Sequence, residues 1–212
     1  MAKPKIPTKK LVVFAIAIPM IGFGVASMVL AHFGLAPLDI TNTGLAKALH
    51  IQVGFASWIS AATLLALAAL LGRRPKAGTL VSVLFIGLSI NTAIAILPSP
   101  STISLRLVYL AAGLAVLYSG ITLLVLAALG AGPSEELMLA LGSKGAKIHH
   151  ARWLIELALF VAGVALSGQV GPVTVLFVLT TGPILAWSIP NFAKVAKIDP
   201  PSPDPFPPGD FR

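Results

Sequence analysis

Six long apolar runs, separated by shorter polar stretches, dominate the chain. They cover residues 11–33, 51–71, 79–97, 107–129, 153–166 and 170–189, and a charge, Glu156, interrupts the fifth. A helix needs about 20 apolar residues to cross the roughly 30 Å of hydrocarbon in a bilayer. The pattern therefore predicts an all-α integral membrane protein with six transmembrane helices.

Two of the polar stretches are longer than a turn, and each contains a good start for a short helix. Proline at a first helical position followed by an acid is favourable there, because the proline lacks only an N–H that would be unpaired and the acid complements the helix dipole. Pro37 is followed by Asp39, and Pro133 by Glu135 and Glu136. We expect short helices after Pro37 and Pro133.

The second half of the chain repeats the first at nearly constant spacing. Residues 11–97 form repeat 1, residues 98–106 a linker and residues 107–192 repeat 2, flanked by a basic tail (1–10) and a proline-rich tail (193–212). Each repeat contains three spans, an odd number, so the second copy must cross the membrane in the opposite sense. Such a 3+3 inverted repeat is a recurring construction of secondary transporters, although a duplication can also simply make a stable bundle. The matching pairs are Gly24 with Gly120, Gly34 with Gly130, Pro37 with Pro133, Asp39 with Glu135, Trp58 with Trp153, Thr79 with Thr174 and Gly87 with Gly182.

Composition and charge placement agree with a membrane protein. Hydrophobic residues make up 57% of the 212 and charged residues 10%, against about a quarter charged in soluble domains. If the N-terminus is cytoplasmic, all of the 15 Lys and Arg residues except Lys47 and Arg106 fall on the cytoplasmic side, as the positive-inside rule requires. Both termini are therefore predicted to be cytoplasmic, and the scattered basic residues do not suggest nucleic acid as a partner.

Glu156 is the sharpest candidate for a functional residue, because a carboxylate in hydrocarbon is costly. Arg152 lies four residues earlier, on the same helical face. The pair is either structural, near the cytoplasmic surface, or a proton or cation site that lines a cavity between the halves.

The other polar candidates are two acids and a row of hydroxyls. Asp39 and Glu135 occupy equivalent places after the two prolines, where they either frame entrances to a transport path or simply cap helices. Ser57, Ser60 and Thr63 follow one another at near-helical spacing and are predicted to line a midplane pocket, unless they bond their own backbone.

Catalysis and cofactors are not expected. The chain has no cysteine, and His149 and His150 are adjacent, so they point about 100° apart on a helix and cannot chelate a metal alone. No phosphate loop or nucleophile elbow is present. The prolines of residues 199–212 predict an extended tail, which is either a disordered end or a segment that binds a protein partner.

A set of short motifs covers almost the whole chain before the tail: Gly22, Gly24, Ala26, Gly34, Pro37, Asp39, Gly130, Gly132, Pro133, Glu135 and the stretch from Thr174 to Pro183, which ends in Thr181, Gly182 and Pro183. These motifs resemble the YczE and YitT group of bacterial membrane proteins. The resemblance implies a helical, multi-span protein of the bacterial inner membrane, and it implies no biochemical activity. Members of the group often have an acid four residues after the glycine that matches Gly87. This chain has Asn91 there, which removes the charge that ion coupling at that position would need.

Together these features predict a small-solute transporter or permease, in which the lipid bilayer and a small solute or ion are the partners. The rival hypothesis is an accessory or scaffold subunit without transport activity, which would bind another protein or a second copy of itself. A water-accessible central cavity that contains Glu156 would favour transport, and solid packing around Glu156 would favour a scaffold.

Overall fold

The computed structural model describes residues 7–198, which form only helices and the loops between them. Six of these helices are long and apolar enough to cross a membrane, so the predicted all-α fold with six candidate spans is confirmed. The proline-rich residues 199–212 lie outside the described part. The six helices are α1 (Thr8–Ala31), α3 (Val53–Leu70), α4 (Ala77–Ile96), α5 (Ile103–Ala127), α7 (Ile148–Ala165) and α8 (Pro172–Ala196).

Two short helices, α2 (Pro37–Leu49) and α6 (Pro133–Ser143), interrupt the series where they were predicted. Each begins at its proline after an extended residue. The first turn of α2 contains Asp39, and that of α6 contains Glu135 and Glu136. Carboxylates in this position stabilise the helix through its dipole.

Helices α7 and α8 extend furthest beyond the apolar runs that predicted them. Helix α7 begins at Ile148, so its first turn is polar and Glu156 lies well inside the helix. Helix α8 continues past Pro190 to Ala196. Pro190 removes the backbone donor of the Ala186 carbonyl, and the Asn191 side-chain amide makes a separate bond to the Trp187 carbonyl (2.7 Å). Hydropathy therefore located the spans but not their ends.

Helices α1 and α5 form the centre of the molecule and run antiparallel. Near the start of α1, Phe14 packs in one cluster with Ala127, which ends α5. At the end of α1, the Ala31 carbonyl accepts a hydrogen bond from Arg106 Nε (2.8 Å), which belongs to the first turn of α5. The start of α1 therefore contacts the end of α5, and the end of α1 contacts the start of α5.

The crossing of α1 and α5 is made by one glycine from each helix. A Cβ atom added at Gly24 would lie 2.7 Å from the Leu117 Cβ, and one added at Gly120 would lie 2.9 Å from the Ile21 backbone nitrogen. Both distances are too short for real Cβ contacts, so each glycine permits the close approach. Gly24 and Gly120 are partners in the predicted repeat, and so are Ile21 and Leu117, so the same contact occurs twice.

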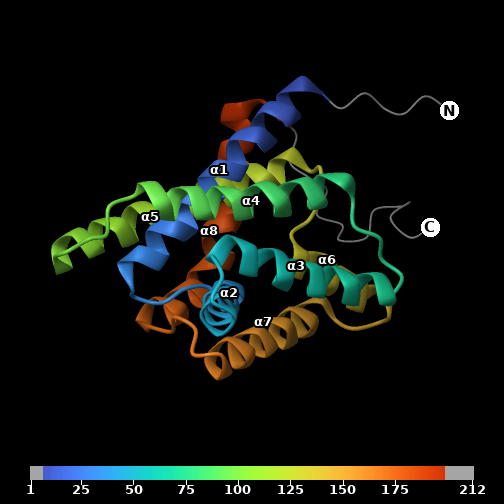
Figure 1. The fold of residues 1–212 in the computed structure, drawn as a ribbon. Coiled ribbons are helices and arrows are strands. Elements are labelled where there is room, and N and C mark those ends of the chain that lie inside the picture. The colour runs from blue at the N-terminus through green and yellow to red at the C-terminus, as the bar shows by residue number, and fades with distance from the viewer. Residues whose placement is uncertain (1–6, 199–212) are drawn as a thin grey trace.

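The two short helices each pack against the other half of the chain. Figure 1 shows α2 almost end-on between α3 and α7. The Thr41 hydroxyl of α2 donates to the Leu159 carbonyl of α7 (2.6 Å), while Ala140 of α6 packs in a cluster with Leu64 and Ala68 of α3. Neither half is therefore a closed unit, because each covers the short helix of the other.

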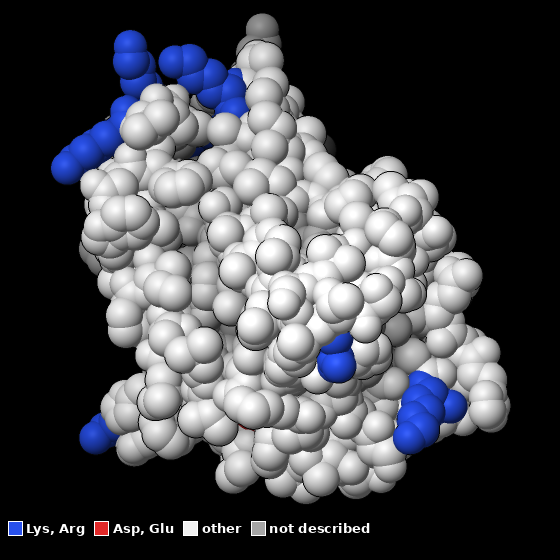
Figure 2. Space-filling model, turned by 90° about the vertical axis from the view of Figure 1, so that its left-hand side faces the viewer, with Lys and Arg blue, Asp and Glu red and all other residues white. Residues whose placement is uncertain are grey.

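The outer surface is apolar. Figure 2 shows one face on which Lys and Arg form a few separate groups and the remainder is uncharged. Large hydrophobic side chains project outward from the spans, among them Leu70, Trp153 and Leu179 with 84%, 76% and 68% of their surface exposed. In water such a surface would be unfavourable, whereas in a bilayer it contacts lipid tails.

Candidate functional site

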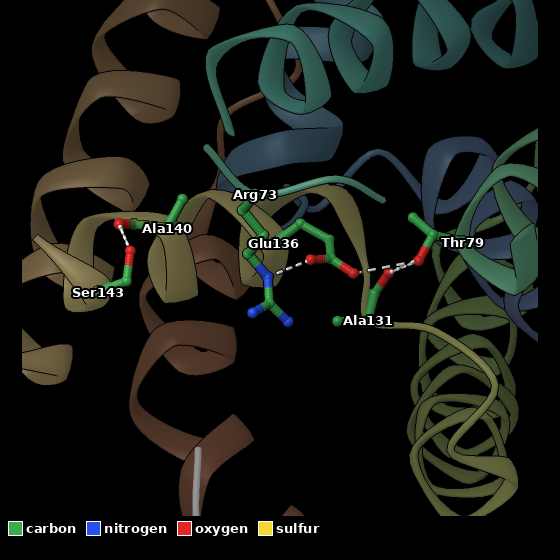
Figure 3. Close-up of polar contacts among 6 residues, drawn as sticks. All are labelled: Arg73, Thr79, Ala131, Glu136, Ala140 and Ser143. Atoms are coloured by element: carbon green, nitrogen blue, oxygen red, sulfur yellow. Dashed lines mark hydrogen bonds and ion pairs between the residues drawn. The ribbon is translucent and has the colours of Figure 1, made fainter. Parts of the chain in front are cut away.

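The strongest electrostatic feature among residues 7–198 is a buried ion pair between Arg73, which follows α3, and Glu136 of α6 (Figure 3). Arg73 is 5% exposed and Glu136 1%. On the other side of Glu136, the Thr79 hydroxyl of α4 contacts both Glu136 Oε1 (3.3 Å) and the Ala131 carbonyl (2.9 Å). One hydroxyl hydrogen serves two acceptors, so the pair links α3, α4 and α6 in a single network.

From the sequence, Glu136 was predicted only as an acid at a helix start, and Arg73 counted only as one of the basic residues on the cytoplasmic side. A signal for burial was present, because Glu136 lies four residues before the buried Ala140 of α6. Three or four residues separate neighbours on one face of a helix. An acid in register with an inward-facing apolar residue was therefore a candidate for a buried charge.

The positions that the predicted repeat makes equivalent to Glu136 and Arg73 are Ile40 and Gly168, and they too are in contact. A Cβ atom at Gly168 would lie 2.1 Å from the Ile40 carbonyl oxygen. The local turns also match, since the Arg73 amide donates to the Ala68 carbonyl (3.0 Å) and the Gly168 amide to the Gly163 carbonyl (2.8 Å). One end of the molecule thus has an ion pair where the other has a close approach between a glycine and the Ile40 backbone.

A second polar cluster lies between the middles of α5 and α8 and consists of hydroxyl groups. Tyr118 Oη lies 3.0 Å from Thr180 Oγ1 and 3.2 Å from Thr181 Oγ1. Both threonines donate to backbone carbonyls of their own helix, so Tyr118 is the donor to them. Deeper along the same interface, Thr122 Oγ1 and Ser188 Oγ are 2.7 Å apart. We call these five residues the hydroxyl cluster.

The hydroxyl cluster has more acceptor capacity than donors. The hydrogens of Thr180, Thr181 and Thr122 go to backbone carbonyls, and the single Tyr118 hydrogen is shared between two oxygens. The cluster is therefore suited to a ligand that donates hydrogen bonds.

Glu156 and Arg152 form an ion pair within one turn of α7, with Arg152 Nε 2.9 Å from Glu156 Oε1. Their side chains are 30% and 45% exposed, respectively. The same two residues, with Glu135 and Ser134 of α6, line a shallow pocket between the helices. The structure thus brings three of the predicted candidates together, at the α6–α7 junction and away from the α1–α5 crossing.

Asp39 is separate from that group and contacts its own helix. Asn42 Nδ2 donates to Asp39 Oδ1 (3.2 Å). Burial raises the pKa of the Asp39 carboxyl to about 6, and the hydrogen bond from Asn42 lowers it in part. The side chain is only half-buried by surface area, so the raised pKa reflects densely packed protein around a carboxylate that water still reaches.

The remaining candidates do not share a site. Asn91 Oδ1 accepts a hydrogen bond from the Gly54 amide (2.7 Å) and so caps the first turn of α3 from α4. Ser57 donates to the Gly54 carbonyl and Thr63 to the Ile59 carbonyl, both on their own helix. Ser60 is buried, and within residues 7–198 its hydroxyl has no hydrogen-bond partner.

Comparison with known proteins places the chain in a family without assigned chemistry. The family described as "Family of unknown function (DUF6198)" matches residues 8–190. An uncharacterised protein of Haemophilus influenzae is 25% identical over 191 residues, which cover 90% of this chain and 88% of that protein. The uncharacterised membrane protein YczE of Bacillus subtilis is 30% identical over 175 residues, or 81% of each chain. The resemblance to YczE-like membrane proteins is confirmed, and no solved structure matches.

Proposed function

The chain belongs to the DUF6198 family, whose function is unknown, and from its geometry we propose that it carries a small polar solute across the bacterial inner membrane. In this proposal two inverted three-span halves exchange conformations, so that a site between them faces the two sides in turn. The solute is transported unchanged, without catalysis by the protein.

The observation that supports this proposal best is the duplication of contacts about the α1–α5 crossing. Gly24 packs on Leu117 as Gly120 packs on Ile21. At the ends of the same helices, a Cβ at Gly34 would meet Thr174 Oγ1 at 2.8 Å, and a Cβ at Gly130 would meet Thr79 Oγ1 at 2.4 Å. Paired contacts between antiparallel helices are the pattern expected of a pseudo-two-fold axis in the membrane plane.

The hydroxyl cluster supports the choice of solute. Tyr118 lies two residues from Gly120, beside the crossing, and Thr181 lies next to Gly182 and Pro183 in the middle of α8. Transporters of inverted-repeat construction bind their substrates near the bilayer midplane, at helices whose backbone is interrupted. The cluster has surplus acceptors and no charged side chain, so we propose a neutral solute that donates hydrogen bonds.

We further propose that the N-terminus and C-terminus are cytoplasmic. In this orientation the buried Arg73–Glu136 pair lies at the cytoplasmic ends of α3 and α4, and the contact between Ile40 and Gly168 lies at the opposite side. The placement of the Lys and Arg residues supports the assignment. Glu156, Arg152 and Glu135 then lie at the cytoplasmic mouth, where they act on solute entry.

Solute flux into reconstituted vesicles tests the proposal. Purified protein in phosphatidylethanolamine and phosphatidylglycerol vesicles is mixed with urea, acetamide or glycerol, and swelling is followed by stopped-flow light scattering. We expect at least one of these solutes to enter faster than in protein-free vesicles. Thr181→Val should slow that entry at least fivefold, because it removes a hydroxyl of the cluster without changing side-chain volume.

Thr63→Val is the matched control. Thr63 is an exposed residue of another span, and its hydroxyl bonds only the Ile59 carbonyl of its own helix. Its substitution should leave entry unchanged. The proposal fails if all three solutes enter at the protein-free rate, or if Thr63→Val slows entry as much as Thr181→Val.

A further inference from the structure

The last two spans of the first half, α3 and α4, pack differently from the last two spans of the second half, α7 and α8. In the first half, α3 and α4 are in close contact. Trp58 Nε1 donates to the Leu84 carbonyl (3.1 Å), and a Cβ atom at Gly87 would lie 2.2 Å from Trp58 Nε1. The indole of Trp58 therefore lies directly on the glycine surface of α4.

The second half has the same residues but not the contact. Trp153 stands where the repeat places the equivalent of Trp58, and Gly182 where it places that of Gly87. Trp153 is 76% exposed, and a Cβ atom at Gly182 would have nothing within 4 Å. Helices α7 and α8 are therefore apart at the point where α3 and α4 meet.

The acceptor for a Trp153 contact is already in place. The residue equivalent to Leu84 is Leu179, and its carbonyl has lost its helical donor because position 183 is a proline. A carbonyl without a donor, or an indole N–H without an acceptor, is costly in a lipid environment. Bringing Trp153 onto α8 would satisfy both groups at once.

We infer that the protein has a second conformation, in which α7 closes on α8, the Trp153 indole lies on Gly182 and its N–H donates to the Leu179 carbonyl. This inference rests on the proposed exchange between inverted halves. By the same exchange, Trp58 leaves Gly87 and α3 separates from α4. Each half then adopts the arrangement that the other has in the observed conformation, which is how inverted repeats produce alternating access.

The absence of cysteine from the chain allows the second conformation to be trapped. In the first half, a Cβ atom at Gly54 would lie 2.7 Å from the Asn91 Cγ. The equivalent pair in the second half is His149 and Ala186, which are both exposed in the observed conformation. When α7 closes on α8, cysteines at these two positions come within the distance that a disulfide requires.

The experiment compares His149→Cys/Ala186→Cys with His150→Cys/Ala186→Cys in vesicles, with copper phenanthroline as oxidant and free thiols counted by mass spectrometry after maleimide labelling. Position 150 points about 100° away from position 149 around the helix. We expect the 149–186 pair to form a disulfide at least tenfold faster. Adding Gly182→Leu, which fills the place of the Trp153 indole, should slow that reaction at least fivefold.

Gly87→Ala provides the opposite bias. Its methyl group would collide with Trp58 in the observed conformation but not after α3 and α4 separate, so it should accelerate the 149–186 reaction. The inference is overturned if the 149–186 pair reacts no faster than the 150–186 pair, or if Gly182→Leu leaves its rate unchanged. If the protein admits solute but the 149–186 disulfide does not form, the second conformation is refuted and the transport proposal stands. If the disulfide forms but no solute enters, only the transport proposal is refuted.

Discussion

Removal of Arg73 tests whether the buried pair with Glu136 is as desolvated as its geometry indicates. Arg73→Met keeps most of the side-chain length and leaves the Glu136 carboxylate, 1% exposed, in contact with the Thr79 hydroxyl. Removing one partner of a buried ion pair typically costs about 3–5 kcal/mol, because the other charge stays buried. We expect a loss of this size in the free energy of unfolding.

A double-mutant cycle separates the pair from the other contacts of Arg73. Two unit charges about 4 Å apart interact by about 4 kcal/mol at an effective dielectric constant near 20. The single variants Arg73→Met and Glu136→Gln and the double variant should therefore give a coupling energy of about 2–4 kcal/mol. The double variant should be more stable than Arg73→Met alone, since no unbalanced carboxylate remains.

The assay is unfolding by sodium dodecyl sulfate in mixed lipid and detergent micelles, followed by far-UV circular dichroism. The exposed pair of Arg152 and Glu156 is the internal control, and its cycle should give about 0.5 kcal/mol or less. A coupling energy for Arg73 and Glu136 as small as that of the control would show that water screens the pair, and the reasoning from its burial would be wrong.

Three further variants test other parts of the structure in the same assay. Asp39→Asn should be about 1 kcal/mol more stable than the parent chain at pH 7 and equal to it at pH 4. Because the pKa of the Asp39 carboxyl is raised from 3.8 to about 6, the parent chain loses stability as pH rises from 4 to 7. A pKa shift of this size corresponds to about 3 kcal/mol at most, and the partial exposure of the side chain reduces the effect. Equal stability at both pH values would contradict this. Gly24→Leu should cost more than about 3 kcal/mol by forcing α1 from Leu117, whereas Ala111→Leu, on an exposed position of α5, should cost little. Thr122→Val should cost about 1 kcal/mol through its lost bond with Ser188, and a neutral result would mean that the serine finds another partner.

The spans and short helices could be predicted because the bilayer imposes them. Hydrocarbon forces a spanning chain into helices, and a proline followed by an acid favours a helix start through local chemistry. The burial of the Glu136 side chain could not be predicted in the same way, because it depends on how α6 packs against α3. This is a contact between distant parts of the chain. Local pattern therefore predicted the elements but not their pairing.

The candidate site was harder to predict than the fold. A charge within an apolar run directed attention to Glu156, yet Arg152 pairs with it on an exposed helix surface, and the role of Glu156 in transport stays a prediction. The hydroxyl cluster was missed because tyrosine, threonine and serine are common in membrane helices and are not conspicuous in hydropathy. Only the packing of α5 on α8 shows that Tyr118, Thr181 and Ser188 converge.

The packing of α2 on α7 has a consequence for biosynthesis. The Thr41 hydroxyl and its acceptor, the Leu159 carbonyl, are 118 residues apart in the chain. At about 5–20 residues per second, the ribosome needs roughly 6–24 s to supply α7 after α2 has emerged. During this interval Thr41 lacks the Leu159 carbonyl, but its hydroxyl still has the Pro37 carbonyl of its own helix as an acceptor (3.2 Å), so α2 can form before its neighbour is made.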